Sequence, residues 1–118
     1  MEPEDSISTE AIQVHSASHV IDLHCDLLLT SYFLRWNWSR RHRHNPFPFA
    51  LLMGHADIPR LREGGVDSMA LGIVINPMRR KSGPDAIRSD LTRMANEVLR
   101  APKDLAIART AQGLLSTR

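Results

Sequence analysis

The sequence is poor in cysteine and holds no long apolar run, and both absences narrow its class. Cys25 is the single cysteine, so the chain cannot form an internal disulfide, which suits a reducing compartment. The uncharged apolar run near Leu27–Leu34 is far shorter than the ~20 residues that a membrane-spanning helix needs. The first residues are acidic where a secretory signal would be basic, so we expect a cytoplasmic protein without a membrane segment.

Length and charge set further limits on the fold. The 118 residues are enough for one domain but not for a complete (β/α)8 barrel, which needs roughly 200–250 residues. The net charge of +2 is too small to indicate nucleic-acid binding by itself. Acidic residues gather at the N-terminus, which predicts a disordered acidic tail over residues 1–18, whereas residues 35–43 hold four arginines and no acid.

Apolar segments of the first part predict strands that alternate with helices. Residues 19–24 and 68–75 are typical of strands buried in a parallel sheet. A helix is predicted to begin near Asp26. Another is predicted over residues 57–65, with Asp57 as its cap, a proline in its first turn and a glycine pair at its end.

The last part of the chain predicts one long helix from residue 84 to 100. Its apolar residues recur at helical spacing: Ile87, Leu91, Met94, Val98 and Leu99. Its polar residues fall largely on the other side: Arg88, Asp90, Arg93, Asn96 and Glu97. Residues 105–108 are predicted to be extended, and Thr110 to cap a last helix. Strands alternating with helices predict an α/β protein with parallel strands, and because two strands alone make no stable sheet of this class, we expect part of a larger fold.

The pattern Asp22-Leu23-His24-Cys25-Asp26 is the sharpest chemical signal. On a regular strand Asp22, His24 and Asp26 project from one face, while Leu23 and Cys25 point away. An imidazole and a carboxylate at the end of a strand can ligate one metal ion, and zinc lowers the pKa of a bound water to about 7. The alternative is that the pattern arises by chance and only caps the following helix.

Two longer segments carry a resemblance. Val20–Asp26 (VIDLHCD) resembles the first-strand motif of the membrane (renal-type) dipeptidase family, peptidase family M19. His55–Val66 (HADIPRLREGGV) is similar to the stretch between the first and second strands of that family, and the apolar strand after it fits the same order. The resemblance covers residues 19–75 closely and residues 84–118 more loosely.

The resemblance implies a (β/α)8 TIM barrel of the metal-dependent amidohydrolase type, which binds two zinc ions and hydrolyses dipeptides. By the family motif, His24 and Asp26 are metal ligands. The family's further ligands, a bridging glutamate and two histidines from later strands, have no counterpart here, and Glu97 falls in a predicted helix instead. We therefore expect residues 19–118 to form an incomplete barrel domain of about two strands with their helices, from a truncated, split or relic gene.

Two alternative functions stay open. A non-catalytic fragment with open sheet edges could act through association with a complementary fragment or another copy of itself. The basic segment around Trp36, Trp38 and His42 could stack on bases and bind phosphates, although an exposed loop is the simpler reading and we expect no nucleic-acid partner. Cys25 is expected to be a small buried residue and not a nucleophile. His55 belongs to the motif, but nothing in the sequence makes it a ligand.

Overall fold

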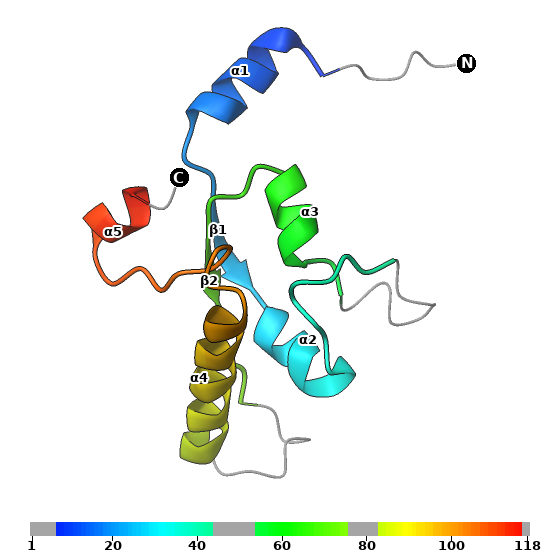
Figure 1. Ribbon diagram of the computed structural model, residues 1–118, viewed down its shortest axis with the longest axis vertical. Coiled ribbons are helices and arrows are strands. Elements are labelled where there is room, and N and C mark those ends of the chain that lie inside the picture. Colours follow the sequence, from blue (N-terminus) through cyan, green and yellow to red (C-terminus); the bar gives the residue numbers. More distant parts are fainter. Residues whose placement is uncertain (1–6, 44–53, 76–82, 117–118) are drawn as a thin grey trace.

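The computed structural model describes residues 7–43, 54–75 and 83–116 of the chain (Figure 1). Along these residues five helices and two strands follow one another in this order: α1 (Thr9–Ala17), β1 (Ile21–Cys25), α2 (Leu27–Leu34), α3 (Ile58–Glu63), β2 (Ser68–Leu71), α4 (Gly83–Arg100) and α5 (Ala111–Leu115). The two strands form one parallel sheet, as the sequence predicted.

The register of the sheet contains one irregularity. Ile21 is aligned with Ser68 and Cys25 with Leu71, so β1 spends one residue more than β2 over the same distance. The extra residue lies between Asp22 and Cys25 and forms a bulge in β1. Because the strands are parallel, their carboxyl ends lie at the same edge of the sheet, which is where α/β proteins usually bind ligands.

Helix α3 begins and ends as the sequence predicted. The Asp57 carboxylate accepts a hydrogen bond from the backbone N–H of Arg60 at 3.0 Å, which satisfies one of the free amides of the first turn. At the other end the N–H of Gly64 donates to the carbonyl of Arg60. Gly65 then takes a φ of 65°, a left-handed conformation that costs glycine little and turns the chain into β2.

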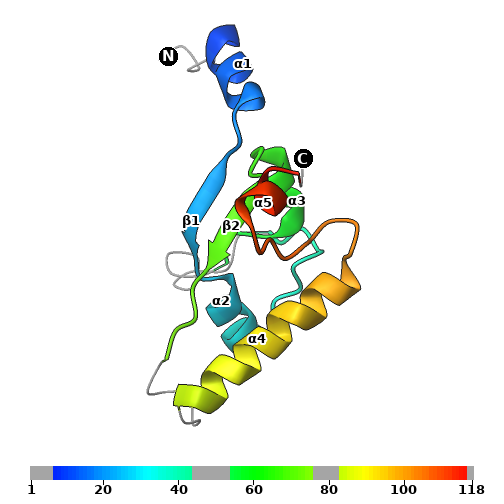
Figure 2. The same cartoon turned by 90° about the vertical axis from the view of Figure 1, so that its left-hand side faces the viewer.

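The segment predicted to be a disordered tail differs from that expectation in its second half. Residues 9–17 form helix α1, because Ser8 caps the helix by accepting from the N–H of Ala11 at 3.1 Å. Side-chain packing adds little, since α1 buries none of its residues and projects from the rest of the chain (Figure 2). The imidazole of His15 connects α1 to the end of α3, with its Nε2 3.0 Å from the carbonyl oxygen of Gly64. Residues 1–6 lie outside the described part.

Helix α4 packs differently from the prediction. Ala86, Asp90 and Glu97 are buried, and the Arg93 guanidinium donates to the carbonyl of Ser31 in α2 at 3.4 Å. The prediction that Asp90 and Glu97 occupy the outer side is therefore wrong. The apolar residues of α4 face β2. The adjacent side of the helix, which carries small and polar residues, therefore packs on α2.

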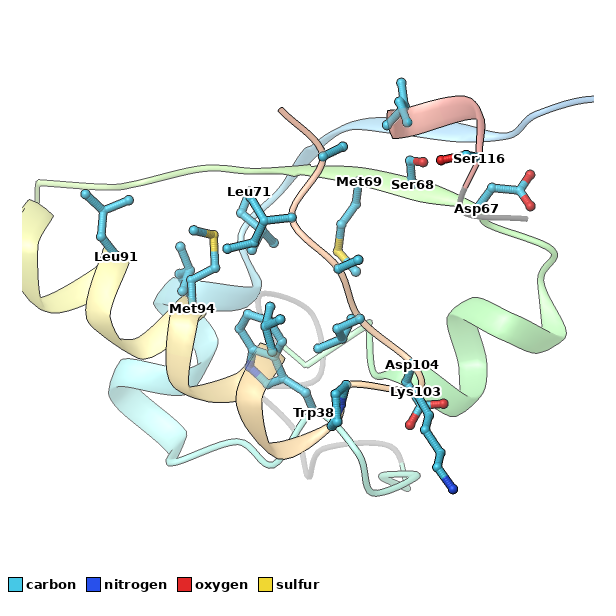
Figure 3. Close-up of a pocket in the computed structure, with 18 of the residues that line it drawn as sticks. Trp38, Asp67, Ser68, Met69, Leu71, Leu91, Met94, Lys103, Asp104 and Ser116 are labelled. Atoms are coloured by element: carbon cyan, nitrogen blue, oxygen red, sulfur yellow. The ribbon is translucent and has the colours of Figure 1, made fainter. Parts of the chain in front are cut away.

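The apolar stripe of α4 and the face of β2 enclose a hollow of about 650 Å³. Figure 3 shows Leu91 and Met94 of α4 facing Met69 and Leu71 of β2 across it, with Trp38 beside them. Residues 102–108 line much of the rest of the hollow, together with Leu114 of α5. Residues 105–108, predicted to be extended, belong to no helix and to no strand. After them Thr110 caps α5 as predicted, accepting from the N–H of Gly113 at 3.0 Å.

The buried core is small and lies under the sheet's α2 side. Its contiguous cluster consists of Cys25, Leu27, Leu28, Trp36, Trp38, Ile58 and Ala101. The molecule extends 50 × 41 × 21 Å, and Leu23 of β1 leaves 79% of its surface exposed. Among the described helices none is long and apolar enough to cross a membrane. The described residues thus form a parallel two-stranded sheet with helices around it and with β1 largely exposed.

Candidate metal site

The two predicted metal ligands lie together at the carboxyl end of β1, His24 within the strand and Asp26 directly after it. The imidazole Nε2 of His24 is 3.3 Å from the carboxylate Oδ1 of Asp26. Both side chains face solvent, with exposed fractions of 72% and 49%. A contact between two side chains this exposed contributes at most about 1 kcal/mol to stability, because water competes with it. The fold therefore gains little from the contact.

The alternative role of Asp26, as a cap for the following helix, has no support in the geometry. Asp26 occupies the N-cap position of α2, yet its side chain accepts no hydrogen bond from the amides of the first turn. Its backbone carbonyl accepts from the N–H of Thr30 instead. A carboxylate at an N-cap normally satisfies one of these amides. The Asp26 carboxylate points to His24 and is available to a ligand.

Gly72 forms the opposite side of this pair, and the sequence reasoning missed it. Its N–H donates to the carbonyl of Cys25 at 3.0 Å, which holds the residue after β2 against the end of β1. A methyl group on Gly72 would lie 3.0 Å from Asp26 Oδ1 and 3.1 Å from His24 Cε1. In the sequence Gly72 interrupts the apolar run of residues 68–75, whereas β2 ends at Leu71, and only the sheet register shows which residues Gly72 approaches.

Asp22 does not project beside His24 and Asp26 as predicted. The register irregularity between Asp22 and Cys25 interrupts the strict alternation of the strand, and among the described residues no three His, Cys, Asp or Glu side chains gather as ligands of one metal would. Instead the Asp22 carboxylate accepts a hydrogen bond from the backbone N–H of His24 at 3.0 Å. Leu23 and Cys25 also lie in different environments: Leu23 is exposed and Cys25 is buried.

The His24–Asp26 pair fits one edge of a zinc site. With bonds of about 2.0–2.1 Å to nitrogen and oxygen, two ligand atoms of a tetrahedral zinc ion lie about 3.4 Å apart. The separation of His24 Nε2 and Asp26 Oδ1 is 3.3 Å. The donor set, one imidazole and one carboxylate, is also one that zinc accepts. Within residues 7–43, 54–75 and 83–116, no three His, Cys, Asp or Glu residues gather into a metal-binding group.

Two other residues of the sequence analysis lie away from the pair. Glu97 is buried in α4 and its carboxylate accepts from the Arg100 guanidinium at 2.8 Å, so it has a structural contact within the helix. Cys25 packs in the core as expected, and burial raises the pKa of its thiol. A buried thiol with a raised pKa is a poor nucleophile.

The motif over residues 55–66 has a structural centre in Asp57. Its carboxylate is fully buried and accepts hydrogen bonds from the backbone N–H of His42 at 2.9 Å and from the Arg60 guanidinium at 2.8 Å. Burial by itself raises the pKa of Asp57, but these hydrogen bonds and the Arg60 charge outweigh it and lower the pKa. Asp57 thus joins the basic loop to α3. His55 is exposed and lies outside the His24–Asp26 pair.

Within residues 35–43, the described part of the basic loop, both tryptophans are buried. The Trp38 indole is buried and its Nε1–H donates to the Ser31 hydroxyl. Trp36 is also buried, and its ring stacks on the His42 imidazole with centroids 3.6 Å apart. Single-stranded nucleic acids bind to exposed aromatic faces. The two tryptophans therefore serve the core, and the described arginines of the loop are left without an aromatic partner of that kind.

Comparisons of the chain with protein-family models, with curated proteins and with solved structures found no match. The candidate site is the pair His24 and Asp26, with Gly72 beside it at the carboxyl edge of the sheet.

Proposed function

We propose that the chain is the N-terminal part of a zinc-dependent dipeptidase whose barrel it begins, and that His24 and Asp26 are metal ligands. The observation that carries the proposal is the Asp26 carboxylate, which leaves the α2 amides uncapped and lies 3.3 Å from His24 Nε2. The pair lies at the carboxyl end of a parallel strand, which is where barrel enzymes bind their substrates. The resemblance of residues 19–75 supplies the substrate class, a dipeptide.

The chemistry of the pair follows from its donor atoms. His24 would bind zinc through the Nε2 lone pair of the neutral imidazole, and Asp26 would bind through Oδ1 and offset part of the ionic charge. When bound, zinc supplies a Lewis acid that activates water for attack on a peptide carbonyl. The exposure of both side chains leaves their outer side open to a substrate and to further ligands. Because a catalytic zinc usually has three protein ligands, we expect this chain alone to bind the ion weakly and to hydrolyse nothing.

Calorimetric titration with zinc tests the ligand assignment. The wild-type chain is expected to bind one zinc ion, and His24→Ala and Asp26→Ala are each expected to abolish that binding. His15→Ala is the matched control, because His15 is also exposed and its Nε2 lies 3.0 Å from the Gly64 carbonyl oxygen. Binding that survives in both His24→Ala and Asp26→Ala would contradict the proposal.

A second candidate function is association without catalysis, and the open side of the fold favours it. Leu23 and Ile75 are largely exposed, and the hollow between α4 and β2 is lined mainly by apolar side chains. Exposed apolar surface of this kind often marks a protein interface. Sedimentation velocity over a range of concentrations separates the two ideas: a chain that stays monomeric at high concentration removes self-association, whereas zinc binding bears only on the first proposal.

A further inference from the structure

Gly72 stands where backbone geometry does not require a glycine. Its φ lies outside the left-handed region, in contrast to Gly54 and Gly65, which take φ values of 84° and 65°. Glycine loses more conformational freedom on folding than alanine does, so an ordinary backbone conformation does not favour glycine. Conformation therefore gives no reason for a glycine here.

Space gives one. An added Cβ would lie 3.0 Å from Asp26 Oδ1, 3.1 Å from His24 Cε1 and 3.6 Å from His24 Nε2. The first two separations are shorter than ordinary van der Waals contact, so the imidazole and the carboxylate would have to move by a few tenths of an ångström. Since both side chains are exposed, they would move outward and apart at little cost to the fold.

We propose that Gly72 is a positioning residue for the His24–Asp26 pair, and that its missing side chain lets the two groups meet at the spacing of ligands on one divalent cation. The inference rests on the proposed function and extends it to the second strand. Gly72 is fixed to β1 by its hydrogen bond to Cys25, so the space beside the pair is set by the pairing of the two strands. Metal affinity thereby depends on a residue that offers no ligand atom.

The test compares Gly72→Ala with Gly83→Ala in the full chain. Gly83 is the matched control, because the nearest atom to an added Cβ there is Ile75 Cδ1 at an ordinary 3.4 Å. Zinc titration is expected to give a dissociation constant at least about ten-fold higher for Gly72→Ala, the effect typical of groups that orient ligands. Gly83→Ala is expected to bind zinc as the wild type does, and the urea midpoint of Gly72→Ala is not expected to fall.

Two results would overturn the inference. The first is wild-type zinc affinity in Gly72→Ala. The second is a loss of affinity that is matched by a fall in the urea midpoint, because Gly72 would then serve the fold. If the wild-type chain binds no zinc, the proposed function fails, and Gly72 is judged by the nuclear Overhauser effect between its Hα protons and His24 Hε1. That effect supports the close approach when present and overturns it when absent.

Discussion

The buried carboxylate of Asp57 provides the sharpest prediction about the fold. It accepts three hydrogen bonds, from the N–H groups of His42 and Arg60 and from the Arg60 guanidinium, at 2.8–3.0 Å. Asp57→Ala removes the acceptor for all three and leaves a guanidinium beside a cavity. Arg60 also donates to the Gly54 carbonyl at 2.9 Å, so it cannot swing out without losing a further contact.

The magnitude follows from the burial of the two partners. Breaking a buried ion pair from one side costs about 3–5 kcal/mol, because the remaining charge stays buried. The Asp57 side chain is fully buried but the Arg60 side chain is 23% exposed, so water reaches part of the guanidinium and we expect the lower limit, about 3 kcal/mol. In urea unfolding followed by tryptophan fluorescence, this corresponds to a midpoint lower by about 1.5 M.

The matched control is a more exposed ion pair in which one partner comes from the same helix, α3. Arg62 of α3 pairs with Asp104, and both side chains are partly exposed. Asp104→Ala is expected to cost less than about 1 kcal/mol, as exposed pairs do. Equal effects of Asp57→Ala and Asp104→Ala, both below 1 kcal/mol, would refute the reasoning that Asp57 joins the loop to α3.

Three further predictions concern pH, the bulge and the core. The pKa of Asp57 is lowered in the folded chain, so its contribution to stability is fully present above the ordinary value of about 3.9 and is lost as the pH falls through the lowered pKa; acid titration of stability should show this loss in the wild type and not in Asp57→Ala. Asp22→Ala should raise the solvent exchange rate of the His24 amide about ten-fold, whereas Asp22→Asn keeps an acceptor and should not; equal rates in the two variants would contradict the hydrogen bond. Trp38→Phe should lower the free energy of unfolding by about 1–3 kcal/mol, since the buried Ser31 hydroxyl loses the indole donor; an unchanged urea midpoint would contradict this.

Local rules account for much of the fold. Asp57 and Thr110 cap their helices because each offers a side-chain oxygen to free amides, which depends only on nearby sequence. The parallel pairing of β1 with β2 follows from apolar strands separated by a helix. The sequence does not predict helix α1, because its weak amphipathicity gives no helical signal and its Ser8 cap lies in a polar segment typical of a tail.

What escaped prediction depends on contacts between distant residues. The burial of Asp90 and Glu97 is set by which stripe of α4 meets α2, and helical spacing alone identifies only the apolar stripe. The spacing of His24 and Asp26 placed both near one strand end, but the bulge that removes Asp22 from their face arises from the register with β2. Gly72 is one step further removed, since it matters only through the partner strand.

The central claim, a metal site at His24, is tested most directly by the long-range ¹H–¹⁵N spectrum of the imidazoles during zinc addition. The chain has six histidines, each giving its own pair of nitrogen resonances. Direct coordination changes the shift of the nitrogen that binds, so the spectrum identifies the residue and the atom. We predict that zinc moves Nε2 of His24 and leaves the other five imidazoles in place, and that Asp26→Ala removes the change. A shift confined to other histidines, or none at His24, would contradict the account.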